Sequence, residues 1–184
     1  MINAKAAACT HKSVSWIAAA LVVATSCVSG ATPSMDSAKS MADVLKTVKA
    51  TGAKVIWLNV WATDCSPCMA EMPVLVQMAE KFKGNKDVAF VGLCLPADSA
   101  VKKGAMAVAT AIMKKKEIPY PNLLWLGTAD ALQAKFNIQG TPYNVLLSAD
   151  GEILSEVDVP ENAAKAADVI SSAIATALKQ NPAK

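Results

Sequence analysis

Cys65 and Cys68 are the residues of this sequence whose type and spacing best suit chemistry. They lie in Trp-Ala-Thr-Asp-Cys-Ser-Pro-Cys, residues 61–68, directly after an apolar run at 55–60 that predicts a buried strand. A helix that begins here puts both sulfurs on one turn, and its unpaired N–H groups favour a thiolate at Cys65. Pro67 suits the first turn, where its missing N–H is not needed. A pair of this kind can exchange disulfides, because Cys65 can attack a disulfide and Cys68 can resolve the mixed disulfide.

Two other interpretations of the pair remain open. A zinc site needs about four ligands, and beyond the N-terminal 26 residues the chain adds only Cys27 and Cys94 and no histidine. A purely structural disulfide is disfavoured because so short a loop restrains the unfolded chain little. Cys94 lies in the apolar run Val-Gly-Leu-Cys-Leu, which predicts a buried, inert thiol in preference to a third redox cysteine.

The N-terminus has the layout of a secretory signal. Lys5 and Lys12 precede an apolar stretch at 16–24, which is too short to span a bilayer, and small residues lead to Cys27. Val-Ala-Thr-Ser-Cys at 23–27 resembles a bacterial lipobox, so we expect Cys27 to be lipidated; simple cleavage after Ala31 is the alternative.

We therefore expect a signal peptide at 1–26, a tether at 27–36 and one domain at 37–181. Of the 184 residues, 53% are hydrophobic and 18% are charged, which is enough apolar material for one sizeable core. The formal charge is +3 and falls to +1 when the two signal lysines are removed. The sequence contains no arginine, which argues against nucleic-acid binding and, because a twin-arginine signal is impossible, favours the Sec route.

The apolar periodicity predicts an alternation of helices and strands. The expected helices are 37–51, the segment from the cysteine pair to Gly84, 99–117, 128–136 and 161–179, and the expected strands are 54–60, 87–95, 122–126, 143–148 and 152–157. The run Lys114 to Lys116 indicates a solvated helix face.

This order of elements resembles the thioredoxin fold, an α/β fold with a central mixed sheet flanked by helices. Across residues 38–180 the chain resembles the TlpA and ResA type of exported thiol-disulfide oxidoreductase. The matching motifs are Asn59-Val-Trp-Ala-Thr, Cys65-Ser-Pro-Cys, Glu71-Met-Pro, Ile138-Gln-Gly-Thr-Pro and Asp150-Gly. The helix and strand at 99–126 are similar to the family's usual insertion between the second strand and the Gly-Thr-Pro motif.

The resemblance implies that Cys65 is the exposed nucleophile and Cys68 the resolving thiol. It implies a cis bond between Thr141 and Pro142 facing the pair, whose backbone would pair with an extended substrate; an ordinary trans turn is the alternative. Glu71 corresponds to the family's acid beneath the disulfide, which would exchange the resolving thiol's proton, although a solvated helix charge is the plainer interpretation.

Trp61 and Asp64 complete the predicted substrate-binding residues. Asp64 departs from the family pattern, which usually has tryptophan before the first cysteine. Its carboxylate opposes formation of a thiolate at Cys65 by about 1 kcal/mol at 4 Å in water, so we expect a less acidic cysteine than in relatives.

The implied function is that of an exported reductant that exchanges disulfides with protein substrates, in cytochrome c maturation or in periplasmic thiol maintenance. It implies a membrane electron donor of the DsbD or CcdA kind, a lipid anchor, and no cofactor or metal besides the redox-active disulfide. The alternatives are a copper chaperone of the Sco type and a non-catalytic binding module. The Sco chemistry requires a histidine, and the only one here, His11, lies in the expected signal.

Overall fold

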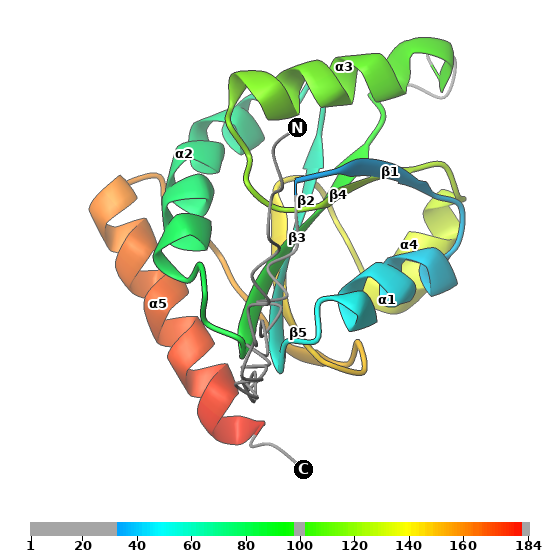
Figure 1. The fold of residues 1–184 in the computed structure, drawn as a ribbon. Coiled ribbons are helices and arrows are strands. Elements are labelled where there is room, and N and C mark those ends of the chain that lie inside the picture. The colour runs from blue at the N-terminus through cyan, green and yellow to red at the C-terminus, as the bar shows by residue number, and fades with distance from the viewer. Residues whose placement is uncertain (1–32, 98–101, 182–184) are drawn as a thin grey trace, which may run out of the picture.

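A six-stranded sheet forms the centre of the molecule in the computed structural model, which describes residues 33–97 and 102–181 (Figure 1). The strand order is β1-β4-β3-β2-β5-β6. The strands are β1 (Met35–Ala38), β2 (Val55–Ala62), β3 (Val88–Leu95), β4 (Asn122–Trp125), β5 (Tyr143–Ser148) and β6 (Ile153–Glu156). The helices are α1 (Met41–Ala50), α2 (Ser66–Lys81), α3 (Lys102–Lys115), α4 (Ala129–Phe136) and α5 (Ala163–Gln180).

The sheet is mixed, as the sequence predicts. Strands β1, β4, β3 and β2 run parallel, whereas β5 is antiparallel to both β2 and β6. All eight residues of β2 are buried, which explains its unbroken apolar run, since a central strand is covered on both faces.

Two hydrophobic cores lie on opposite faces of the sheet. Alternate side chains of β2 point to opposite faces, so that Trp57 and Trp61 pack with α2, α3 and α5, and Ile56 and Leu58 pack with α1 and α4. Figure 1 shows the two groups of helices on either side of the sheet. Helix α2 therefore lies directly over the face that carries the odd-numbered residues of β2.

The first helix begins later than its apolar pattern predicts. Ser40 caps it by accepting a hydrogen bond from the Asp43 backbone N–H, and Asp43 in turn accepts one from the Ser40 N–H, which fixes the helix start after residue 37. Residues Met35–Ala38 instead form β1 and pair with β4, so the last two residues of the expected tether lie in the sheet.

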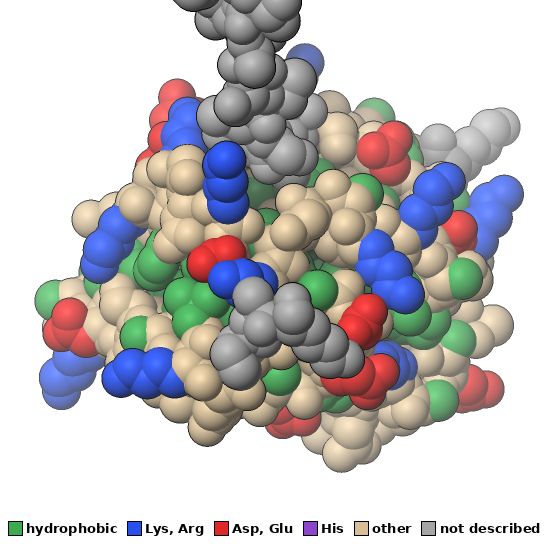
Figure 2. Space-filling view, turned by 60° about the horizontal axis from the view of Figure 1, so that its bottom comes forward, with side chains coloured by type: hydrophobic (Ala, Val, Ile, Leu, Met, Phe, Trp, Pro, Cys, Tyr) green, Lys and Arg blue, Asp and Glu red, His purple; other side chains and the backbone are tan. Residues whose placement is uncertain are grey.

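Helix α3 and strand β4 occupy the segment in which the family insertion was expected. Strand β4 lies between β3 and β1 in the sheet; its correspondence to the family's insertion stays a prediction. None of the helices in the described part of the chain is sufficiently long and apolar to cross a membrane. Figure 2 shows acidic and basic side chains interspersed with hydrophobic ones over the face that it draws. The expected signal peptide and Cys27 lie outside the described residues.

Candidate active site

The two cysteines meet at the start of α2, where they form a disulfide with a Cα–Cα distance of 5.3 Å. Cys65 is the N-cap, and its Sγ accepts a hydrogen bond of 3.1 Å from the Cys68 backbone N–H. Cys65 is 8% exposed and Cys68 2%. Both cysteines are thus buried in the disulfide form, and Cys65 is the slightly more exposed of the two. The role of Cys65 as an exposed nucleophile stays a prediction.

The Thr141–Pro142 peptide bond is cis, as the family resemblance implies, and both residues are partly buried. Pro142 and Glu71 line the same small cavity, of about 140 Å³. The loop before β5 therefore lies beside the helix that carries the cysteines. The substrate-binding role of Thr141 and Pro142 stays a prediction.

Glu71 lies one helical turn beyond Cys68 and is not the solvated surface charge that its residue type suggests. Its Oε1 accepts hydrogen bonds from Asn144 Nδ2 at 2.8 Å and from Asn59 Nδ2 at 3.3 Å. Burial raises the pKa of the carboxyl from 4.5 to about 7, and the hydrogen bond from Asn144 opposes this rise. At neutral pH such a group can both accept and donate a proton.

Asn144 and Trp57 are residues of this site that the sequence analysis missed. Trp57 Nε1 and Asn59 Nδ2 both donate to Asn144 Oδ1, each at 3.0 Å. The only local signal is an asparagine in an otherwise apolar strand, and its partners lie 73 to 87 residues away in sequence.

Trp61 cannot contact a substrate in this structure, contrary to its predicted role. It is 0% exposed, and its Nε1 donates to Asn122 Oδ1 at 2.9 Å within the core. The reason is its register in β2, which points the indole under α2 and α3. Asp64 is exposed in the turn before Cys65, so it can face a partner; its effect on Cys65 stays a prediction.

Lys116 also differs from expectation. Lys114 and Lys115 are exposed, as a solvated helix face requires, but Lys116 is partly buried and its Nζ donates to the Met69 carbonyl oxygen at 2.9 Å. Pro73 lies inside α2 and has no N–H with which to bond that carbonyl. Lys116 thus supplies the missing donor within the first turns of the active-site helix.

Cys94 is buried in β3 and free, as its apolar surroundings predict. Burial raises the pKa of its thiol to about 12, which disfavours the thiolate that redox chemistry needs. In the described residues there is no group of three or more His, Cys, Asp and Glu side chains arranged to hold a metal ion.

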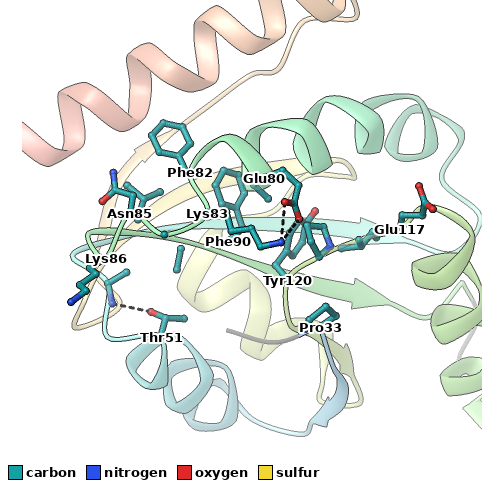
Figure 3. Close-up of a pocket in the computed structure, with 17 residues that line it drawn as sticks. Pro33, Thr51, Glu80, Phe82, Lys83, Asn85, Lys86, Phe90, Glu117 and Tyr120 are labelled. Atoms are coloured by element: carbon teal, nitrogen blue, oxygen red, sulfur yellow. Dashed lines mark hydrogen bonds and ion pairs between the residues drawn. The ribbon is translucent and has the colours of Figure 1, made fainter. Parts of the chain in front are cut away.

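A larger cavity in the described part of the chain lies away from the disulfide. It has a volume of about 560 Å³ and is formed around the end of α2 and the start of β3; Phe82, Phe90 and Tyr120 supply aromatic walls (Figure 3). Glu80 and Lys83 form an ion pair of 3.1 Å at its edge. Neither active-site cysteine lines this larger cavity, whereas the smaller cavity is lined by Glu71 and Pro142.

A thioredoxin-like sheet, a Cys-x-x-Cys pair capping a helix and a cis-proline loop define a thioredoxin-fold dithiol–disulfide protein. The Redoxin family model matches residues 30–170, and the chain belongs to this family.

The chain is similar to the thiol-disulfide oxidoreductase ResA of Bacillus cereus, with 25% identity over 113 residues. The match covers 61% of this chain and 58% of that relative, so the chain spans little more than half the length of the relative. This similarity and the family match bear out the resemblance to the TlpA and ResA type.

Solved structures confirm the fold. A thioredoxin-related protein of Neisseria meningitidis serogroup B matches with a TM-score of 0.55 and 21% identity, over 69% of this chain and 87% of that chain. A thioredoxin-family thiol:disulfide interchange protein of Chlorobium tepidum TLS matches with a TM-score of 0.52 and 22% identity, over 68% and 83%. The predicted fold class, a thioredoxin-like α/β fold with a mixed sheet flanked by helices, is thus correct.

Proposed function

We propose that this chain is an exported thiol-disulfide oxidoreductase that reduces protein disulfides through Cys65 and Cys68. The observation that carries the proposal is the disulfide at the start of α2 with the half-buried Glu71 carboxyl one turn further along. A static disulfide needs no such acid, whereas a dithiol that must gain and lose protons does.

The reduced form begins the reaction with an attack of the Cys65 thiolate on one sulfur of a substrate disulfide. A Cys65–substrate bond forms, the substrate's S–S bond breaks, and the departing sulfur takes up a proton. The Glu71 carboxylate then accepts the proton of the Cys68 thiol, and the Cys68 sulfur attacks Cys65. The Cys65–Cys68 bond forms, and the second substrate thiolate leaves and takes up a proton, so two electrons have passed to the substrate.

The disulfide needs a dithiol donor to complete the cycle. We propose a membrane protein of the DsbD or CcdA kind, because the expected signal and lipid anchor hold the domain at the outer side of a membrane. The substrates are extended protein segments that pair with the backbone at Thr141. Cytochrome c maturation and general periplasmic thiol maintenance both fit this chemistry.

Single cysteine variants test the proposal. Cys65→Ser is expected to abolish the reduction of insulin disulfides, since the attacking sulfur is gone. Cys68→Ser is expected to accumulate a mixed disulfide through Cys65, which non-reducing electrophoresis and mass spectrometry detect. Full insulin reduction by Cys65→Ser, or equal trapping by both variants, would contradict the roles, and an inactive wild-type protein would favour a non-catalytic binding module.

A further inference from the structure

Two asparagines from paired strands bond to the Glu71 carboxyl, and a tryptophan bonds to one of them. Asn59 of β2 and Asn144 of β5 are register partners, and Trp57 lies two residues before Asn59 on the same face of the sheet. Asn144 contacts all three of the others through its amide: its Oδ1 accepts from Trp57 and Asn59, and its Nδ2 donates to Glu71.

The direction of these hydrogen bonds follows from the tryptophan. An indole Nε1–H is a donor only, so it requires the Asn144 oxygen on its side, and the Asn144 nitrogen must then face Glu71. Asn59 stands between two acceptors, Asn144 Oδ1 and Glu71 Oε1, and so presents its nitrogen to both. Its own Oδ1 is buried with no hydrogen-bond partner among the described residues, which is the cost of this arrangement.

We propose that Asn144, oriented by Trp57, is a positioning residue that presents an amide N–H to the Glu71 carboxyl and so sets the protonation state in which Glu71 meets the Cys68 thiol. An N–H donor stabilises the charged carboxylate more than the protonated acid and therefore lowers the pKa of the carboxyl. Asn144 therefore offsets part of the effect of burial, and without it Glu71 stays protonated to higher pH and cannot accept the thiol proton. This role rests on the proposed function of Glu71 as proton carrier.

Other ionisable groups lie on the elements packed around Glu71. Negative charge on a neighbour opposes ionisation of Glu71. Burial raises the pKa of Tyr120, and the charge of Glu71 raises it further. Lys116 is bonded to the Met69 carbonyl on the same helix. The remaining groups are Cys65 and Cys68 at the start of α2, Tyr143 of β5, Glu156 of β6 and Asp158 after it.

The test measures the titration of Glu71 directly in the disulfide form, in which neither active-site thiol titrates. The carboxyl ¹³C shift of Glu71, assigned by its absence in Glu71→Gln, is followed against pH. Asn144→Leu, close to asparagine in shape but without donors, is expected to raise the Glu71 pKa by about one unit. Trp57→Phe removes the orienting N–H together with part of the indole ring, and it is expected to raise the Glu71 pKa by about half a unit, although residue 57 does not bond to Glu71.

Trp61→Phe is the matched control. Trp61 lies in the same strand, is equally buried and also donates its Nε1–H to an asparagine Oδ1, that of Asn122, but this amide does not bond to Glu71. The Trp61→Phe variant is expected to leave the Glu71 pKa unchanged. An unshifted pKa in Asn144→Leu overturns the proposal, and equal shifts in Trp57→Phe and Trp61→Phe overturn the orienting role of Trp57.

The pH dependence of mixed-disulfide resolution distinguishes a failure of this inference from a failure of the proposed function on which it rests. In Asn144→Leu the acid limb of the rate of mixed-disulfide resolution is expected to move to higher pH by the same amount as the Glu71 titration, which a merely structural defect would not produce. If Glu71→Gln resolves mixed disulfides at the wild-type rate with an unchanged pH profile, Glu71 is not the proton carrier. The carboxyl titrations remain interpretable in that case, because they need no turnover.

Discussion

Glu71 illustrates how opposing effects on one residue are decided by their magnitudes. Burial disfavours the carboxylate, whereas amide donors from Asn144 and Asn59 stabilise it. The pKa of the carboxyl is raised to about 7, so burial is the larger effect and the hydrogen bonds limit it. The result places the acid where a proton carrier works best, near neutral pH.

The raised pKa predicts a loss of stability as the pH rises. Below about pH 4.5 Glu71 is protonated in both the folded and the unfolded chain, and between about pH 4.5 and 7 only the unfolded chain ionises. Ionisation of Glu71 in the unfolded chain therefore lowers the free energy of unfolding by on the order of 3 kcal/mol by pH 7. We expect Glu71→Gln to lack this decrease, as measured by denaturant unfolding of the disulfide form across that range. Glu80→Gln, an exposed site on the same helix, should retain it, and an equal decrease in wild type and Glu71→Gln would contradict the assignment.

At the scale of the element, helix α2 has a well-capped N-terminus but lacks one backbone hydrogen bond in its interior. Cys65 caps its first turn and Pro67 lies within it, yet Pro73 in its interior leaves the Met69 carbonyl without an intrahelical donor. Lys116, just after α3, bonds to that carbonyl. A residue from the α3–β4 segment thus supports the helix turn that carries Cys68 and Glu71.

Lys116→Met should destabilise the protein, because the Met69 carbonyl oxygen would lose its hydrogen-bond donor. It keeps most of the apolar stem but removes the charge-assisted hydrogen bond, and for a partly exposed lysine we expect a loss of about 1 kcal/mol. The melting temperature should fall by roughly 2–4 °C. Lys115→Met, one residue earlier and exposed, is the control and should change it little. Equal effects of the two substitutions would show that the Met69 contact contributes nothing.

At the scale of the whole molecule, the sheet places the site at one end and the large apolar cavity in another region. The predicted lipidation of Cys27 bears on where the domain lies. Strand β1 begins at Met35, so only seven residues separate it from Cys27. A lipid on Cys27 would therefore hold the domain close to the membrane surface, within reach of a membrane donor.

Lipidation of Cys27 is tested by expressing the full chain in a bacterium and separating membrane from soluble fractions. We expect the wild type in the membrane fraction, with mass spectrometry showing a mature chain that begins at a lipid-modified Cys27. Cys27→Ser should lose the lipid, whereas Cys9→Ser, within the expected signal, should not. A soluble mature chain that begins at Thr32 would establish simple secretion instead.

The sequence by itself determined the features that depend on residues close together along the chain. The two-residue spacing of Cys65 and Cys68 predicted the disulfide pair, and the helix and strand periods predicted the elements, because each is a local pattern. The cis bond at Pro142 was implied by the family resemblance. The boundaries of the elements were displaced where a cap or a distant strand intervened, as at Ser40 and Met35.

Tertiary structure alone decided which distant side chains meet. The bond of Asn144 to Glu71 and that of Lys116 to Met69 join residues 73 and 47 positions apart, and no local pattern encodes such pairings. The burial of Trp61 likewise depends on the helices that cover β2. The site's reactive atoms were therefore predictable from composition and spacing, whereas the network that sets their protonation arises from the packing of α2 onto the sheet.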